Sequence, residues 1–169
     1  DPYAKRSTWS ETMLATRANV LAKMANQGES ELTLGAWSIT APIPGTFDGT
    51  TIAEVFFNPT AKDDAGAPLW KLGAYADGQV HMLPGRDQAS TYLHRIITAP
   101  EDMELPCGFG SDDGLIVFFN GERILAADVP RGPGVDQNTA TLQLKKGANH
   151  LLLKIYNRSG GHGFYFSAD

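Results

Sequence analysis

The sequence predicts an all-β fold, a jelly-roll-like antiparallel β-sandwich that follows an N-terminal α-helix. After Leu32, Gly, Pro, Asp and Asn recur at short intervals and separate short runs of apolar and β-branched residues. One of these runs alternates with a period of two, and an Asn-Gly pair joins two others in the manner of a hairpin. Roughly nine to ten short strands around one core imply two packed antiparallel sheets rather than a parallel sheet covered by helices.

The N-terminal segment, residues 1–30, is expected to be helical and packed on the sandwich domain of residues 31–169. Thr8 and Glu11 have the spacing of a capping box at its start, and Gly28 marks its expected end. Four apolar residues fall near one face of this helix: Trp9, Met13, Val20 and Met24. The segment is therefore predicted to be an amphipathic packing element or linker.

The most regular strand pattern runs from Met103 to Phe109, where the odd positions are apolar and the even ones are not. Pro106 within it indicates an edge or irregular strand, because proline cannot donate to a sheet ladder. Leu115 to Phe119 is apolar on both faces, and Asn120-Gly121 then predicts a type I′ turn into Glu122 to Leu125. Both strands of this hairpin are expected in one sheet.

A second hairpin is predicted where Thr141 to Leu144 alternates, residues 146–149 turn, and Leu151 to Tyr156 follows as a buried strand. Two long irregular stretches, residues 41–69 and 128–138, are rich in Pro, Gly and Asp, and loops of such length usually carry function or are disordered. The other strand candidates are Leu34 to Thr40, Leu69 to Tyr75, Gln79 to Leu83, Thr91 to Thr98, and Gly163 to Ser167.

Composition and charge limit the classes of partner. The 169 residues carry a net charge of −5, which gives a phosphate backbone or an anionic membrane no broad electrostatic attraction, so neither nucleic acid nor membrane is expected as a partner. No apolar run reaches the ~20 residues needed to cross a bilayer. Cys107 is the only cysteine, which excludes an internal disulfide and a cysteine metal cage. A chain that starts at Asp1 without Met is expected to be a processed product or an excised piece.

The run Gly110-Ser111-Asp112-Asp113-Gly114 stands directly before the buried hairpin strand. Together with Asn120-Gly121, the stretch Leu144 to Asn157 and the closing Gly163-Phe164-Tyr165-Phe166, it resembles the carbohydrate-binding-module-like β-sandwich domains of large secreted bacterial proteins. The resemblance spans roughly Trp37 to Phe166. It implies a non-catalytic, carbohydrate-binding-like module of a secreted, multidomain protein, with polysaccharide or glycan and neighbouring domains of a larger chain as partners.

The Asp112-Asp113-Gly114 turn is also similar to the corresponding turn of PA14-type sugar-binding domains, in which two neighbouring aspartates hold a calcium ion that contacts sugar hydroxyls. Adjacent aspartates point to opposite faces of a strand, but in a turn both can converge on one cation. Asp112 and Asp113 are thus candidate calcium ligands, and Asn120 or Asn157 is a candidate for completing the oxygen shell. Alternatively, the two aspartates accept nearby backbone N–H groups and only shape the turn.

Sugar sites usually combine an aromatic ring with planar polar side chains. Trp70 is the preferred ring because it follows the Asp-, Gly- and Pro-rich loop of residues 62–68. The stretch Asn157 to Gly163 combines hydrogen-bonding side chains with glycines and is expected to border a site; alternatively, it is a glycine-rich turn before the last strand. The candidate ligand-binding residues are Trp70, Asp112, Asp113, Asn120, Asn157, Arg158 and His162.

No motif identifies an enzyme. The sequence contains no serine nucleophile elbow, Walker loop or zinc-helix motif, and no spacing marks a pair of catalytic carboxylates. The four histidines are scattered along the chain at His81, His94, His150 and His162. The alternative to sugar binding is a structural or protein-interaction module that docks neighbouring domains. That alternative predicts an exposed apolar patch, whereas sugar binding predicts an exposed ring beside polar side chains.

Overall fold

The computed structural model describes residues 15–22, 31–55 and 57–169. The chain divides into two units, Asp1–Leu32 and Thr33–Asp169. In the first unit, residues 15–22 form an α-helix, which confirms a helix within the N-terminal segment. The predicted cap at Thr8 and Glu11 and the predicted end at Gly28 lie outside the described residues. The packing of this segment on the sandwich stays a prediction.

The second unit is built from strands, with one short helix among its described residues. The first five strands are short: β1 (Thr33–Leu34), β2 (Trp37–Ile39), β3 (Ile43–Pro44), β4 (Lys71–Gly73) and β5 (His81–Met82). The helix α2 (Ile52–Val55) lies between β3 and β4 in the sequence. The later strands are β6 (Ala89–Ala99), β7 (Met103–Asp112), β8 (Gly114–Phe119), β9 (Glu122–Ala127), β10 (Asn138–Leu144), β11 (Gly147–Asn157) and β12 (Gly163–Ala168).

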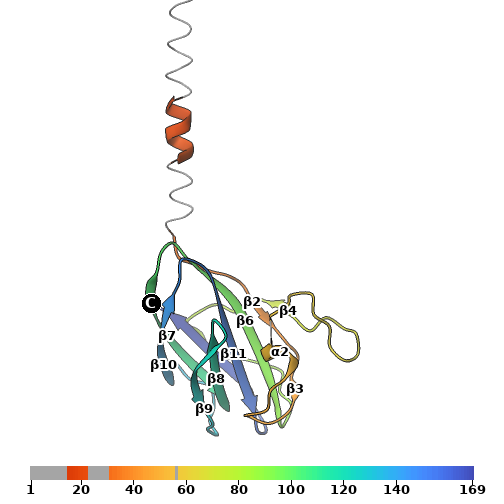
Figure 1. Cartoon of the computed structure of the whole chain (residues 1–169). Coiled ribbons are helices and arrows are strands. Elements are labelled where there is room, and N and C mark those ends of the chain that lie inside the picture. The colour runs from red at the N-terminus through yellow and green to blue at the C-terminus, as the bar shows by residue number, and fades with distance from the viewer. Residues whose placement is uncertain (1–14, 23–30, 56) are drawn as a thin grey trace, which may run out of the picture. The chain divides into compact units, whose positions relative to one another are not determined.

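The strands form two antiparallel sheets, which confirms the predicted all-β fold. The larger sheet has the order β4-β2-β6-β11-β8-β9, and β1 and β3 also pair with β6. The smaller sheet has the order β10-β7-β12-β5. Figure 1 shows β11 between β6 and β8 at the centre of the larger sheet. β11 pairs with β6 along its whole length, from Gly147 opposite Ala99 to Asn157 opposite Ala89.

Aromatic rings from both sheets meet in the interior. Trp37 of β2 packs edge-on against Phe164 and Phe166 of β12, with ring centroids 6.0 and 5.4 Å apart. The guanidinium of Arg95 lies over the rings of Trp37 and Phe166. The odd-numbered side chains of β6 therefore point toward the smaller sheet, and its even-numbered ones, including Tyr92, point to the opposite face of the larger sheet, which we call the outer face.

The predicted hairpin of β8 and β9 is confirmed. Phe119 pairs with Glu122 across a two-residue turn, and Asn120 and Gly121 have φ values of 47° and 83°. A type I′ turn needs positive φ at both central residues, which Asn and Gly adopt most readily. The twist of such a turn matches that of the strands it joins, so the local sequence is sufficient to define this element.

The prediction of a second hairpin is wrong, because β10 and β11 belong to different sheets. The connection turns a corner of the sandwich, and the buried side chain of Asn149 holds it. Its amide donates to the carbonyls of Lys145, Gly147 and Ile97, and its Oδ1 accepts the N–H of Lys145. A local alternation pattern does not distinguish a corner of this kind from a hairpin.

Pro106 predicted an edge or an irregular strand, and of these two the edge strand is wrong, since β7 lies between β10 and β12. β12 pairs with β7 only over Cys107–Asp112, so it ends before Pro106. β10 continues past this point, and its Thr141 pairs with Pro106. Pro106 therefore needs no ladder donor on the β12 side. A strand inside a sheet accommodates proline where one neighbour has already ended.

A buried cluster of charged and polar groups attaches α2 to the outer face. Lys154 of β11 is fully buried, and its Nζ donates to the carbonyl of Gly49 and, at 3.2 Å, to Oε2 of Glu54. The same oxygen accepts the Tyr92 hydroxyl at 2.6 Å and the N–H of Thr51 at 3.0 Å. Burial and the hydrogen bond to Glu54 raise the pKa of Tyr92, so the hydroxyl stays protonated and donates.

Replacing Glu54 with Ala is expected to lower the free energy of unfolding by about 3–5 kcal/mol, because the variant buries the Lys154 ammonium without its carboxylate. The matched control is Glu122→Ala, on the exposed start of β9, with an expected change within about 0.5 kcal/mol. Urea unfolding of both variants measures the difference. Equal stability of the two would show that the cluster does not hold α2.

Candidate functional site

Asp112 and Asp113 lie where the chain leaves the smaller sheet and enters the larger one. Asp112 is the last residue of β7 and pairs with Gly163 of β12. Asp113 follows it through a cis peptide bond, and its N–H donates at 2.8 Å to the carbonyl of Tyr156 in β11. The two aspartates thus stand at one end of the sandwich, next to strands of both sheets.

The Asp113 carboxylate holds two loops. Its Oδ1 accepts the backbone N–H of Arg131 at 3.1 Å, and its Oδ2 accepts the backbone N–H of Arg158 at 2.9 Å. Arg131 belongs to the stretch of residues 128–138, and Arg158 begins the connection from β11 to β12. Asp113 therefore has the loop-shaping contacts that were expected as the alternative to metal binding.

Asp112 differs from its neighbour. Burial, and then the nearby charge and hydrogen bond of Asp113, raise the pKa of Asp112 to about 6. A Cβ atom on Gly161 would lie 3.2 Å from Oδ2 of Asp112, so glycine leaves room for an approach to this oxygen. The Asp112 carboxylate is thus held close to a second carboxylate, an arrangement that a cation would stabilise.

The nearby guanidinium groups are engaged elsewhere. The Arg131 side chain donates to Ser111 and, at 2.6 Å, to Oδ1 of Asn138. The Arg158 side chain forms an ion pair with Asp128 at 2.6 Å. Within the described part of the chain, neither Asp112 nor Asp113 takes part in an ion pair. In this part of the chain, no protein cation is therefore bound to either carboxylate.

Asn157 supplies a further oxygen. Its Oδ1 is buried and has no hydrogen-bond partner among the residues that the structure describes, whereas its amide donates to the carbonyls of Arg86 and Gly160. Tyr156 and Arg158, the residues on either side, both bond to Asp113. Calcium takes six to eight oxygen ligands, so Asp112, Asp113 and Asn157 fit the hard-oxygen chemistry of such a site. Among the described residues, no group of three or more His, Cys, Asp and Glu is arranged to hold a metal. Backbone carbonyls or water would complete the shell.

His162 lies at this end of the sandwich, and its side chain is buried. The residue is 2% exposed, its Nδ1 lies 2.8 Å from the carbonyl oxygen of Asp112, and its Nε2 lies 2.9 Å from the hydroxyl of Thr91. Burial lowers the pKa of His162, which favours the neutral ring, with Nδ1–H donating to the carbonyl. His162 therefore ties β6 to β7 and supports Asp112 from inside, and its role in ligand binding stays a prediction.

The loop of residues 128–138 lies against β7 because two glycines admit it. A Cβ on Gly108 would come within 1.8 Å of Oδ1 of Asp136, and one on Gly110 within 1.9 Å of the carbonyl oxygen of Gly134. Gln137 adds a hydrogen bond to the N–H of Ser111 at 2.9 Å. Larger residues at the two glycines would push this loop away from the aspartates.

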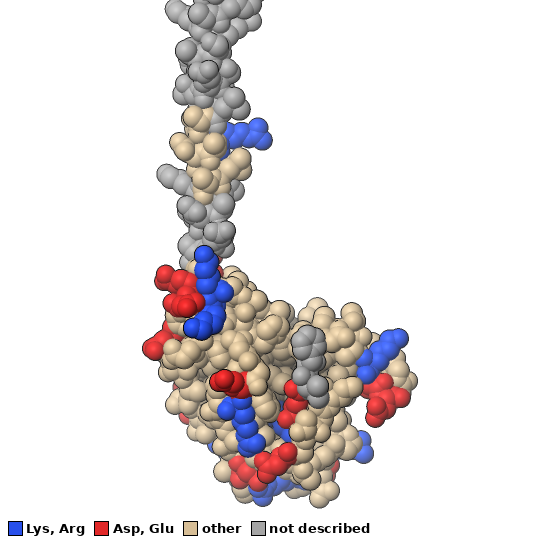
Figure 2. Space-filling model, in the orientation of Figure 1, with Lys and Arg blue, Asp and Glu red and all other residues tan. Residues whose placement is uncertain are grey.

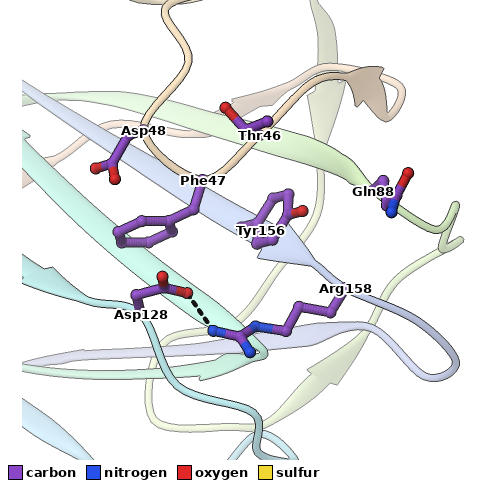
Figure 3. Close-up of a pocket in the computed structure, with 7 residues that line it drawn as sticks. All are labelled: Thr46, Phe47, Asp48, Gln88, Asp128, Tyr156 and Arg158. Atoms are coloured by element: carbon purple, nitrogen blue, oxygen red, sulfur yellow. Dashed lines mark hydrogen bonds and ion pairs between the residues drawn. The ribbon is translucent and has the colours of Figure 1, made fainter.

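A hollow of about 440 Å³ opens on the other side of Arg158 (Figure 3). The rings of Phe47 and Tyr156 lie edge to face, 6.1 Å apart, at one side of it, and the Arg158–Asp128 pair lies at the other. Phe47 is buried, and Tyr156 at the end of β11 is half-buried. The hollow is lined by Thr46, Phe47, Asp48, Gln88, Asp128, Tyr156 and Arg158. Only Arg158 of these was predicted, because the hollow is assembled from four separate parts of the chain: residues 46–48, Gln88, Asp128, and the pair Tyr156 and Arg158.

Two predicted residues lie elsewhere. Asn120 is in the turn at the opposite end of β8 from Gly114, where its side chain bonds to His150 and Asn149. Trp70 is 6% exposed and packs edge-on against Phe57, so it cannot serve as an exposed ring. The structure brings Asp112, Asp113, Asn157, Arg158 and His162 together, and it separates Asn120 and Trp70 from them.

Charges on the face seen in Figure 2 are mixed, and acidic and basic side chains lie near one another. Arg123 and Asp48 form an ion pair at 3.5 Å. In the part of the chain that the structure describes, no helix has the length and hydropathy needed to cross a membrane.

No protein-family model matches the chain, and no curated protein matches it. Among solved structures, the β-glucosidase from Kluyveromyces marxianus in complex with glucose is similar at 19% identity and a TM-score of 0.40, over 48% of this chain and 11% of that one. The PA14 domain of the MpAFP antifreeze protein is similar at 13% identity and a TM-score of 0.43, over 82% and 65%. The PA14 sugar-binding domain from an RTX adhesin is similar at 14% identity and a TM-score of 0.38, over 82% and 70%. At these low values, the function has to be inferred from the residues of the site.

Replacing Asp112 with Asn is expected to stabilise the metal-free protein at pH 7 by about 1–3 kcal/mol, because it removes a buried charge beside Asp113. Because its pKa is raised in the folded state, Asp112 contributes to the free energy of unfolding below about pH 4. This stabilising contribution is lost as the pH rises through about 6. The gain should therefore vanish at pH 4. Urea unfolding in chelator at both pH values measures it, with Asp87→Asn as the control carboxylate, whose Oδ1 accepts the N–H of Gly160. A loss of stability at pH 7 would contradict the inferred repulsion.

Acidification is expected to destabilise the fold through His94. Burial and the neighbouring His150 lower the pKa of His94 to about 4, below its ordinary value of about 6.5. The stability that comes from its neutral ring is present above about pH 6.5 and is lost as the pH falls through 4, by about 3 kcal/mol in total. His94→Gln should flatten the unfolding free energy across this interval, whereas His81→Gln should not. An unchanged slope in His94→Gln would assign the effect to another group.

Proposed function

We propose that this chain is a non-catalytic carbohydrate-binding module that uses a calcium ion at Asp112 and Asp113 to hold a glycan. The observation that carries the proposal is the close pair of carboxylates, one with a pKa raised to about 6, without a protein cation bound to either. A bound divalent cation would remove this repulsion. Asp112, Asp113 and Asn157 would hold the ion, which would present open positions to sugar hydroxyls.

The hollow beside Arg158 supplies the other half of the proposed site. Rings with exposed edges or faces contact the apolar side of a pyranose, and Tyr156 is the half-buried ring available there. Arg158, Asp128 and Gln88 carry planar polar groups that read hydroxyl positions. The Arg158 backbone bonds to Asp113 and its guanidinium bonds to Asp128, so one residue connects the carboxylate pair to the hollow.

The setting of the module follows from the same chemistry. Two carboxylates and an amide form a modest ligand set, typical of extracellular modules that bind calcium with dissociation constants of about 10⁻⁴–10⁻³ M. Such a site is filled only where calcium is abundant. We therefore propose that the module works outside the cytoplasm and, in line with the sequence resemblance, that it is one domain of a secreted multidomain protein.

One observation favours the alternative, a structural module that docks neighbouring domains. Leu72 on β4 is 82% exposed and Met82 on β5 is 64% exposed, and β4 and β5 each end their sheet. Exposed apolar side chains on free strand edges are typical of protein contacts. Leu72 lies in the larger sheet, where it pairs with Ser38, whereas Met82 pairs with Gly163, which also pairs with Asp112 on its other side. A partner docked over Met82 would therefore adjoin the carboxylate pair.

Isothermal titration against a panel of soluble polysaccharides and oligosaccharides, with calcium and with chelator, tests the proposal. Saturable binding that needs calcium is expected. Asp112→Asn should abolish the calcium dependence and weaken glycan binding by at least about tenfold, since it removes one ligand. Because this variant is expected to be more stable without metal, a loss of binding would not reflect unfolding.

Tyr156→Ala should weaken glycan binding while calcium alone still binds, because the ring is not a metal ligand. Asp87→Asn is the control and should bind as the unmodified chain does. The absence of heat with every glycan in calcium would reject sugar binding and leave the docking role. Binding unaffected by chelator and by Asp112→Asn would reject the calcium site and assign the glycan to the hollow alone.

A further inference from the structure

A second cavity, of about 360 Å³, lies on the outer face of the larger sheet. Its floor comes from β6, β8 and β11, and its sides come from α2, Phe57 and the turn between β8 and β9. It is lined by Ala53, Glu54, Phe57, His94, Phe118, Asn120, Gly121, His150 and Leu152. Asp112, Asp113 and the lining of the hollow beside Arg158 contribute nothing to it.

The apolar part of this cavity is built from packed rings and paired strand residues. Phe57 stacks on His94 with ring centroids 3.4 Å apart and planes 9° apart, and it packs edge-on against the buried ring of Trp70. Phe118 and Leu152 pair directly across β8 and β11, and both are half-buried. Cavities of this size with aromatic walls and a few polar groups are typical of small-molecule sites.

Two polar atoms in the wall remain available to a ligand. Three donors converge on Oε2 of Glu54, and Oε1 has no partner among the described residues. In the pair of histidines, Nε2 of His94 lies 2.9 Å from Nδ1 of His150, and Nε2 of His150 has no partner among the same residues. If His94 donates, the neutral His150 ring carries its proton on Nε2 and offers it to the cavity.

The cavity is electrically balanced. Lys154 forms an ion pair with Glu54 at 3.2 Å, and burial keeps His94 uncharged at neutral pH by lowering its pKa to about 4. A charged ligand would therefore meet no compensating charge and would lose its hydration on entry. An uncharged ligand with hydroxyl groups would find one acceptor, at Glu54, and one donor, at His150.

We propose that this cavity is a second, calcium-independent site, which binds an uncharged six-membered ring with apolar faces and hydroxyl groups at its rim. The faces lie against Phe57, Phe118 and Leu152, one hydroxyl donates to Oε1 of Glu54, and another accepts from His150. Both a sugar ring and an aromatic diol have this chemistry. The site does not depend on the glycan site at Asp112 and Asp113.

Trp70 is the reporter for the test, because its ring lies 5.1 Å from Phe57 and 6.2 Å from His94 at the back of the cavity. Methyl glucoside and catechol are titrated separately in chelator, with tryptophan fluorescence and the histidine ring signals in NMR as readouts. At least one probe should cause saturable changes in both signals at millimolar concentrations. Benzoate, which is charged, and benzene, which has no hydroxyl, should bind at least about tenfold more weakly.

Two variants and two matched controls localise the binding. His150→Ala and Phe118→Ala should each weaken probe binding by about tenfold. The fold should persist in both variants, because the His150 side chain is exposed and the Phe118 side chain is half-buried. His81→Ala on β5 and Ile124→Ala on β9 should not change it. Trp70→Phe should remove the fluorescence response while the NMR response remains.

The outcomes separate this site from the calcium site. Binding in chelator and in Asp112→Asn, lost in His150→Ala, supports the second site even if no glycan binds at the aspartates. The probe with the lower dissociation constant identifies a sugar or an aromatic diol as the natural chemistry. No response to either probe, or equal binding by His150→Ala and the unmodified chain, would overturn the proposal.

Discussion

The hydrogen bonds of one residue, Asp113, determine the geometry of the end of the sandwich that carries the candidate site. Its N–H bonds to β11, and its two carboxylate oxygens each accept a backbone N–H, from Arg131 and from Arg158. Charge-assisted bonds of this kind are stronger than neutral ones. They fix the crossing between the two sheets and both neighbouring loops, and they also fix the position of the second carboxylate, Asp112.

This arrangement explains why the same residues serve structure and binding. Holding Asp112 beside Asp113 raises its pKa, because burial and a like charge both disfavour the ionised form. Folding therefore stores an electrostatic cost at one end of the molecule that a bound cation would relieve. The buried Oδ1 of Asn157, which accepts no hydrogen bond from the described residues, also carries a free-energy cost. A ligand that bonds to this oxygen would remove that cost.

The outer face follows a different principle. A buried ion pair, Lys154 with Glu54, anchors α2 over the larger sheet, and Glu54 also lines the cavity there. The cavity and the hollow differ in their chemistry. The hollow has charged groups at its rim, whereas the cavity has aromatic walls and balanced charge.

The sequence by itself determined the local elements and the carboxylate pair. Alternation, turn residues and apolar runs predicted the strands and the β8–β9 hairpin, because these depend on neighbours in the chain. Only the tertiary structure decided that β10 and β11 separate into two sheets, that Trp70 is buried, and that Asn120 lies at the far end of β8. It also brought Phe47, Gln88 and Asp128 together around Arg158. Such contacts join residues that are distant along the chain, and they follow from how the sheets and loops pack rather than from any local pattern.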